Sequence, residues 1–281
     1  MIAAFALAAV VASNAAVQTW NIEPSDRGAV SLRISVRIES PGHDWDTTEE
    51  HDIPEAAFAT TFQGLSRADL ASPAGMKVDF RIVRDAGMLE CEGWAHDGHA
   101  SGDFTVALSQ AFARSLAARG IGTPTEDQQR RMLIANVGYP LIDALEAGRY
   151  DRPSVADLIK LAEHDVTPDY IASLGAAGIH LHSSEELVRI RDHDVTIDYI
   201  NGLRQAGYRN LTPEQYVRLR DHDVTLAFVS GMQAAGYRPT PEELVRLRDH
   251  DVTPEYVADL ARHGYTHLSI DDLIRLRDHG V

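Results

Sequence analysis

Apolar and polar residues alternate in two different ways along this chain of 281 residues. From residue 17 to about residue 108 the apolar positions recur every second residue, most clearly over residues 29–38 and 77–84, which indicates strands with one buried face. Beyond residue 108 they recur every three or four residues as far as the C-terminus, which indicates helices. The chain is therefore predicted to be an α+β protein, with a small antiparallel β domain over residues 16–108 and an α-helical repeat domain over residues 109–281.

Tight turns connect three of the predicted strands. Residues 77–84 are followed by Asp85-Ala86-Gly87, and residues 88–94 are followed by Asp97-Gly98-His99 before a third strand over residues 101–106. Turns of this composition join neighbouring strands, so the three strands are expected to form an antiparallel meander. The acidic stretch over residues 43–52 lacks a run of apolar residues and is expected to be a solvent-exposed loop.

A short motif of the form Asp-His-Asp-Val recurs in the helical part. Its valines are separated by 29, 29, 28 and 29 residues, at Val166, Val195, Val224, Val252 and Val281. A fixed period of this length is typical of a solenoid, in which each unit buries its apolar face only against its neighbours. Fainter copies begin near Phe112, so we expect about five and a half repeats of a helix pair.

Each repeat contains start and stop signals for two short helices. The first helix is expected to begin at a threonine N-cap and to end at a glycine, as between Thr167 and Gly178. The second helix begins with a capping box, at Ser154, Ser183, Thr212, Thr240 and Ser269. In one repeat the expected inward side chains are Tyr170, Ile171, Leu174, Leu187, Val188 and Ile190.

The position after the histidine of the motif, here called the cap column, changes in an informative way. Its occupants are Asn136, Asp165, Asp194, Asp223, Asp251 and Gly280. These residue types share a tolerance of the left-handed backbone that ends a helix. A glycine has no carboxylate and could not replace a ligand. The column is therefore predicted to consist of helix caps, with the next valine folded back onto the last helical turn.

The histidines of the motif could have a function of their own. They are His164, His193, His222, His250 and His279, each beside an acidic residue. Stacking would place them in a row that could bind a partner or a transition metal, or respond to acid. Neighbouring helices pack about 10 Å apart, whereas zinc lies about 2.0–2.1 Å from its nitrogen ligands. Two histidines of adjacent repeats therefore cannot share one zinc ion, and a metal site would also need the flanking aspartates.

A column of arginines falls inside the apolar arc of the second helix. It consists of Arg191, Arg220, Arg248 and Arg277, with Leu133 and Ala162 at the same place in the earlier repeats. The favoured interpretation is structural, with each stem covering the core and each guanidinium bonded to carbonyls or to first-turn acids such as Asp198 or Glu255. The alternative is a row of cations on the concave face that binds a carboxylate-bearing partner.

The charge of the chain excludes one class of partner. Its formal net charge is −16 and its pI is about 5.1, whereas nucleic acids and anionic lipids bind basic surfaces.

Cys91 is the single cysteine, so an internal disulfide cannot form. Its place in an apolar strand favours a buried packing residue over a nucleophile.

The first residues resemble an export signal. Residues 1–12 are apolar and are followed by Ser13-Asn14-Ala15, which has the small residues of a signal-peptidase site, although no basic residue precedes the run. The run is shorter than the roughly 20 residues that span a bilayer. We expect residues 1–15 to be a cleaved signal peptide, with a core segment as the alternative, and no stable membrane insertion after cleavage.

Known catalytic motifs are missing from the sequence. No His-Glu-x-x-His helix, phosphate-binding glycine loop or Gly-x-Ser-x-Gly elbow occurs, and the acids and histidines over residues 43–52 and 96–103 lack the spacing of metal ligands. The sequence therefore predicts a protein that is not an enzyme and that uses no cofactor.

Two sets of residues resemble a known protein family. The helical repeats, such as the one from Thr240 to Val252 with Thr253-Pro254-Glu255-Tyr256, resemble those in the non-catalytic C-terminal regions of bacterial BlaR-type sensor metallopeptidases and related envelope proteins. The residues 80–87, Glu92-Gly93-Trp94 and Gly102-Asp103-Phe104 are similar to the β motif that precedes those repeats. The resemblance covers about residues 77–281 and includes no catalytic residue.

The resemblance implies a free-standing sensor-like or interaction module exported by a bacterium. We therefore expect a periplasmic or secreted scaffold that binds a protein or peptide through its solenoid and acts in envelope sensing. The candidate binding residues are the arginine and histidine columns. The alternative function is metal binding or metal sensing through the repeated His and Asp residues.

Overall fold

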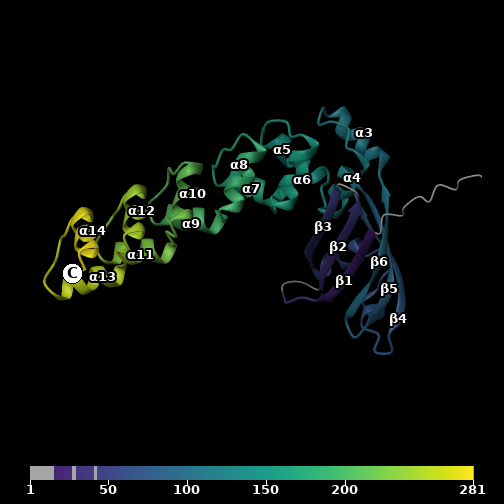
Figure 1. The fold of residues 1–281 in the computed structure, drawn as a ribbon, viewed down its shortest axis with the longest axis horizontal. Coiled ribbons are helices and arrows are strands. Elements are labelled where there is room, and N and C mark those ends of the chain that lie inside the picture. The colour runs from purple at the N-terminus through teal and green to yellow at the C-terminus, as the bar shows by residue number, and fades with distance from the viewer. Residues whose placement is uncertain (1–15, 27–29, 41–42, 281) are drawn as a thin grey trace, which may run out of the picture. The chain divides into compact units, whose positions relative to one another are not determined.

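The computed structural model describes residues 16–26, 30–40 and 43–280, in two compact units. The first unit extends to Arg119 and also contains Thr123–Gly138, and the second contains Gly120–Gly122 and the chain from Tyr139 onwards. The expected signal peptide over residues 1–15 lies outside the described residues. The α+β class is confirmed, because a sheet is followed by helices (Figure 1).

The first unit contains one antiparallel sheet with the strand order β3-β2-β1-β6-β5-β4 (Figure 1). Its strands are β1 (Ala16–Pro24), β2 (Val30–Ser40), β3 (His43–Ile53), β4 (Met76–Arg84), β5 (Gly87–His96) and β6 (His99–Leu108). The predicted meander corresponds to β4, β5 and β6, which pair antiparallel as expected. The two halves of the sheet join where β1 pairs with β6, with Thr19 opposite Asp103 and Ile22 opposite Ala100.

The acidic stretch over residues 43–52 is a strand, and the prediction of a loop was wrong. It forms most of β3 and pairs with β2 along its whole length. Opposite charges face each other across these strands, since Arg33 bonds Glu50 at 3.0 Å and Arg37 bonds Asp46 at 2.8 Å. An edge strand with one solvated face carries charged side chains without loss of pairing, which is why the hydrophobic pattern did not reveal it.

Aromatic residues fill the inner face of the sheet. Trp20 and Phe80 meet edge to face with their ring centroids 4.8 Å apart, and Phe62 lies 5.7 Å from Phe80. Phe62 belongs to the connection from β3 to β4, which contains η1 (Glu55–Ala57), α1 (Phe58–Thr61) and α2 (Arg67–Leu70). At Gly93 a Cβ would lie 2.6 Å from Cζ2 of Trp20, so glycine there leaves room for the indole.

The boundary of the β unit lies further along the chain than the predicted residue 108. Helices α3 (Gln110–Ala118) and α4 (Glu126–Ile134), which were expected in the repeat domain, belong to the first unit. Buried Gln129 donates from Nε2 to the carbonyls of Ala86, at 2.9 Å, and Ser109, at 2.8 Å. Arg84 donates to the carbonyls of Leu133 and Ile134 at the end of α4, and burial lowers the pKa of its guanidinium to about 10. Contacts with the sheet therefore hold these two helices.

The second unit is a double layer of short helices (Figure 1). One layer contains α5 (Tyr139–Ala147), α7 (Pro168–Ala176), α9 (Ile197–Gln205), α11 (Leu226–Ala234) and α13 (Pro254–Arg262). The other contains α6 (Val155–Glu163), α8 (Ser184–Asp192), α10 (Pro213–Asp221), α12 (Pro241–Asp249) and α14 (Ile270–Asp278). Each helix packs against the corresponding helix of the next repeat, as a solenoid requires. Five of the six expected inward side chains are buried, and Tyr170 is partly buried.

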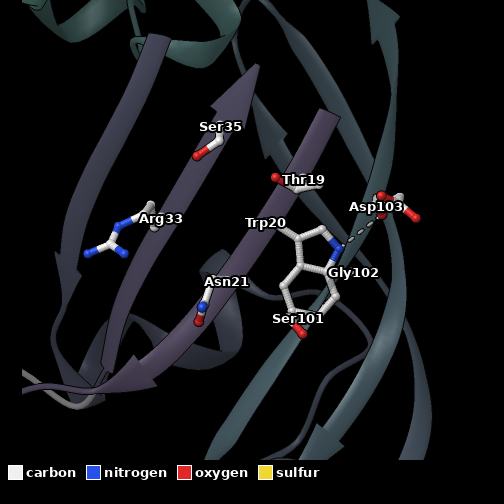
Figure 2. Close-up of a pocket in the computed structure, with 8 residues that line it drawn as sticks. All are labelled: Thr19, Trp20, Asn21, Arg33, Ser35, Ser101, Gly102 and Asp103. Atoms are coloured by element: carbon white, nitrogen blue, oxygen red, sulfur yellow. Dashed lines mark hydrogen bonds between the residues drawn. The ribbon is translucent and has the colours of Figure 1, made fainter. Parts of the chain in front are cut away.

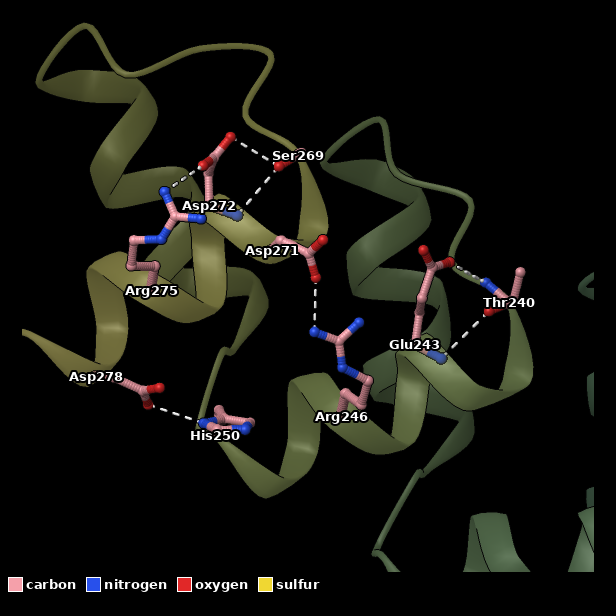
Figure 3. Close-up of polar contacts among 9 residues, drawn as sticks. All are labelled: Thr240, Glu243, Arg246, His250, Ser269, Asp271, Asp272, Arg275 and Asp278. Atoms are coloured by element: carbon pink, nitrogen blue, oxygen red, sulfur yellow. Dashed lines mark hydrogen bonds and ion pairs between the residues drawn. The ribbon is translucent and has the colours of Figure 1, made fainter.

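The capping predictions are confirmed at most positions. Complete capping boxes begin α6, α8, α10 and α12, where the cap hydroxyl and the acid or glutamine exchange hydrogen bonds with backbone amides. Ser269 accepts from the amide of Asp272, but α14 has only this half of the box. Figure 3 shows the two arrangements side by side, at Thr240 with Glu243 and at Ser269 with Asp272.

The cap column adopts the predicted left-handed backbone throughout. The φ angles are 56° at Asn136, 54° at Asp165, 52° at Asp194, Asp223 and Asp251, and 73° at Gly280. In the repeats from Val137 to Val252 the following valine then donates its amide to the carbonyl five residues before it, as Val166 does to Leu161 at 2.9 Å and Val252 to Leu247 at 2.8 Å. These valines are buried, so the motif ends one helix and anchors the turn into the next.

Candidate functional site

The histidine column forms contacts between repeats. In four of the five histidines, Nδ1 of the imidazole lies within hydrogen-bond distance of the aspartate that precedes the histidine of the following repeat. The pairs are His164 with Asp192 at 2.6 Å, His193 with Asp221, His222 with Asp249 at 2.6 Å, and His250 with Asp278 at 2.8 Å. Figure 3 shows the last of these pairs. One ring nitrogen of each of these four histidines is thus committed to the neighbouring repeat.

This arrangement limits what the histidines can coordinate. Within residues 16–26, 30–40 and 43–280, no group of three His, Cys, Asp or Glu side chains lies close enough together to hold a metal ion. Each pair supplies two ligands, whereas protein zinc sites use three or four protein ligands. Among the described residues, no aspartate pairs with His279 in this way.

The arginine column also joins neighbouring repeats. The guanidinium of Arg220 contacts the carboxylate of Asp194 and lies 5.0 Å from the ring centroid of Tyr199. Arg248 repeats this arrangement with Asp223 and with Phe228 at 5.4 Å, and Arg191 donates to the carbonyl of Asp165 at 3.2 Å. These three arginines therefore cover an aromatic ring and bond to the cap of the preceding repeat, as expected of a structural role. Arg277 lies 5.1 Å from the ring centroid of Tyr256.

One detail of the arginine prediction was wrong. The carboxylate that these arginines contact belongs to the cap column, and not to first-turn acids such as Asp198 or Glu255. The left-handed backbone of the cap places Asp194 and Asp223 within reach of the next repeat. The cap residues consequently have a second role that a helix cap alone does not require.

Tyrosine hydroxyls of the first helices donate hydrogen bonds to the following repeat. The hydroxyl of Tyr170 donates to the carbonyl of Val195 at 3.0 Å, and that of Tyr199 donates to the carbonyl of Val224 at 2.7 Å. Burial raises the pKa of Tyr170 to about 12 and raises that of Tyr199 further. The phenols therefore stay protonated at physiological pH, so these donors are retained.

An outer set of ion pairs runs along the second helices. Arg189 bonds Glu214 at 3.0 Å and Arg246 bonds Asp271 at 2.6 Å (Figure 3). Their side chains are about half exposed, so solvent screens these pairs and each contributes little to stability. The arginine column is more enclosed, because Arg220 and Arg248 are 27% and 26% exposed.

We expect Arg220→Ala to lower the free energy of unfolding of the repeat unit by about 1 kcal/mol, since it removes packing over Tyr199 and the contact with Asp194. Among the described residues, Nε of Arg220 is buried without an acceptor. Because the substitution also removes this unpaired group, we expect only a small loss of stability. Arg189→Ala, which removes one of the outer ion pairs, should change it by less than about 0.5 kcal/mol. Thermal unfolding followed by circular dichroism at 222 nm measures both; equal effects would contradict the assignment.

A shallow polar hollow lies on the outer face of the sheet, and the sequence analysis missed it. Its side chains come from β1, β2 and β6, namely Thr19, Asn21, Arg33, Ser35, Ser101 and Asp103 (Figure 2). Beneath it, Nε1 of buried Trp20 donates to the carbonyl of Asp103 at 2.9 Å. The alternation of polar residues along these strands is visible in the sequence. The strand order that makes β2, β1 and β6 neighbours is not, so the sequence could not show that these residues share one hollow.

Cys91 is buried in β5 behind this face, as expected of a structural residue. Burial raises the pKa of its thiol to about 12. The thiolate is the reactive form of cysteine, so at pH 8 the thiol stays protonated and poorly reactive. We expect Ellman's reagent to modify Cys91 at least about 100-fold more slowly in the folded chain than in 8 M urea. A comparable rate in the folded chain would show that the strand opens readily.

No helix in residues 16–26, 30–40 and 43–280 combines the length and apolar character needed to cross a membrane. No protein-family model matches the chain, and neither a curated protein nor a solved structure is significantly similar to it.

Proposed function

We propose that the chain is a non-enzymatic interaction scaffold that binds a protein or peptide through its helical repeat unit. In this proposal the chain is exported to the periplasm or secreted, and it acts in bacterial envelope sensing. The resemblance of the repeats to those of BlaR-type sensors motivates the location and the sensing role. The stacked helix pairs motivate the binding role, because solenoids present extended surfaces to their partners.

One observation carries the proposal. Many polar side chains between repeats are paired with one another, through the His–Asp pairs, the arginine column and the tyrosine hydroxyls. The side chains at the junctions are thereby held in place, so a partner would meet a surface that requires little ordering on binding. The arginine and histidine columns contribute mainly to this rigidity. The outward positions of the first helices are left exposed for a partner.

A row of equivalent outward positions allows a direct test. Ala172, Asn201, Ser230 and Ala258 occupy the same place on α7, α9, α11 and α13, and all are exposed. We would replace each in the full chain by a photo-reactive benzoylphenylalanine in cells that naturally express it. Thr48 and Thr105, exposed on the outer face of the sheet, provide matched controls.

We expect a discrete cross-linked product from at least two adjacent positions of the row and none from the controls. Fractionation of the same cells should place the product with the periplasmic or secreted proteins. If none of the row positions gives a product, or if the sheet positions give the same one, the repeat unit is not the binding surface.

A further inference from the structure

A hollow of about 500 Å³ lies where α11 and α13 meet. Its lining includes Ala235 and Gly236 at the C-terminal end of α11 and Ala261 of α13. Tyr237 and Tyr265 also line it, and Tyr265 is 48% exposed. This volume lies in the range of small-ligand sites in proteins.

The repeats themselves show what normally occupies this place. The position of Ala261 corresponds to Gln233 in the preceding repeat and to Arg204 in the one before it. Nε2 of Gln233 donates to the carbonyl of Ala206, at the end of α9, at 2.7 Å. At Gly178, at the end of α7, a Cβ atom would lie 3.8 Å from Nη2 of Arg204. At both junctions a long side chain with a donor group therefore covers the C-terminal cap of the neighbouring helix.

At the third junction this side chain is replaced by a methyl group. The carbonyl of Ala235 corresponds to that of Ala206, but Ala261 has no group that can donate to it. Of the neighbouring basic residues, Arg238 donates to the carbonyls of Gln233 and Tyr237 near the same end of α11 and Arg262 bonds Asp259, so neither donates to the carbonyl of Ala235. His267 also lines the hollow. The hollow thus combines a helix C-terminus, which attracts positive charge, with two aromatic side chains.

We infer that this hollow binds the arginine side chain of a peptide partner, in the place that Arg204 occupies two repeats earlier. The guanidinium would donate to the carbonyl of Ala235 and lie beside Tyr237 and Tyr265, which the cation attracts. The net charge of −16 favours the approach of a basic segment. The inference rests on the proposed function and names the chemistry of the partner.

The junction between α5 and α7 is a useful contrast. It has Gly175 at the position of Ala261, with open space around a built Cβ, so it too lacks the long side chain. The cap that it faces, however, is Arg149 in place of a glycine. The charge of Arg149 opposes a second cation, so we expect arginine to select the α11–α13 hollow.

The probe for the test is N-acetyl-arginine amide, titrated into the full chain and followed by backbone amide NMR shifts. The citrulline analogue has nearly the same shape without the charge, and the norleucine analogue has neither charge nor donors. We expect saturable shifts at Gly236, Ala261 and Tyr265 with a Kd of about 1 mM, and binding at least about tenfold weaker for both analogues.

Two substitutions exploit the repeat. Ala261→Gln restores the residue of the preceding repeat, so it should fold, fill the hollow and weaken arginine binding at least about tenfold. Gln233→Ala uncovers the end of α9 and should produce a second set of shifts around Gly207. Unchanged binding in Ala261→Gln, or equal binding of arginine and norleucine probes, would overturn the inference.

The two proposals can fail separately. If the cross-links from α7, α9, α11 and α13 persist while the arginine probe does not bind, the scaffold proposal stands and the arginine site does not. If the probe binds as expected but none of these helices gives a cross-link, the hollow accepts arginine and the scaffold proposal is wrong.

Discussion

Replacing Gln129 by glutamate should destabilise the first unit by about 3–5 kcal/mol at pH 7, one of the two largest effects expected in this protein. The side chain is 4% exposed, and its Nε2 donates to the carbonyls of Ala86 and Ser109. An ionised glutamate would place a buried negative charge against two carbonyl oxygens and could donate to neither. The loss should be smaller at low pH, because burial raises the folded-state pKa of the new carboxyl, and stability then falls as pH rises through the normal glutamate range.

Tryptophan fluorescence during urea unfolding measures this effect selectively, since Trp20, Trp45 and Trp94 all belong to the first unit. Gln129→Met is the matched control. It keeps the volume but loses both donors, and the carbonyls retain bonds from the amides of Ser109 and Ala113, so we expect a loss of about 1–2 kcal/mol. If the glutamate variant is as stable as the methionine variant at pH 7, Gln129 is not enclosed as described.

Replacing Asp223 by valine should lower the free energy of unfolding of the repeat unit by about 2–4 kcal/mol. Asp223 has a φ of 52°, a left-handed conformation that a β-branched side chain adopts only with strain. The substitution also removes the carboxylate that contacts Arg248. Because each repeat is held by its neighbours, a strained junction should weaken the array on both sides of it.

Two control variants distinguish the effect of backbone strain on stability from the effect of losing the carboxylate. Asp223→Gly loses the carboxylate but suits the left-handed backbone, and Asp223→Asn keeps an oxygen that can accept from Arg248. Both residue types occur naturally in the cap column, at Gly280 and Asn136, so we expect each to cost less than about 1 kcal/mol. Circular dichroism at 222 nm during thermal unfolding compares the three variants. A glycine variant as unstable as the valine variant would assign the effect to the lost carboxylate.

The repeats were predictable because their boundaries depend on short-range interactions. A serine or threonine with a suitable third neighbour caps a helix start, and Asp, Asn or Gly ends it, within a few residues of chain. The positive φ angles from Asn136 to Gly280 and the burial of the cap valines from Val137 to Val252 follow from this local chemistry. The tight turns of the β4-β5-β6 meander were recognisable for the same reason.

The remaining features depend on contacts between residues far apart in the sequence. The acidic residues of β3 form a strand because β2 supplies their backbone partners and opposite charges, and α4 joins the first unit because Gln129 reaches two carbonyls of the sheet unit. Likewise, a repeated residue reveals its column but not its partner. The stacking distance and rotation between repeats bring His250 to Asp278 and Arg248 to Asp223, and they leave Ala261 facing an uncovered helix end. Local capping signals therefore set where each helix begins and ends, while the packing between units selects which side chains pair and which remain available to a partner.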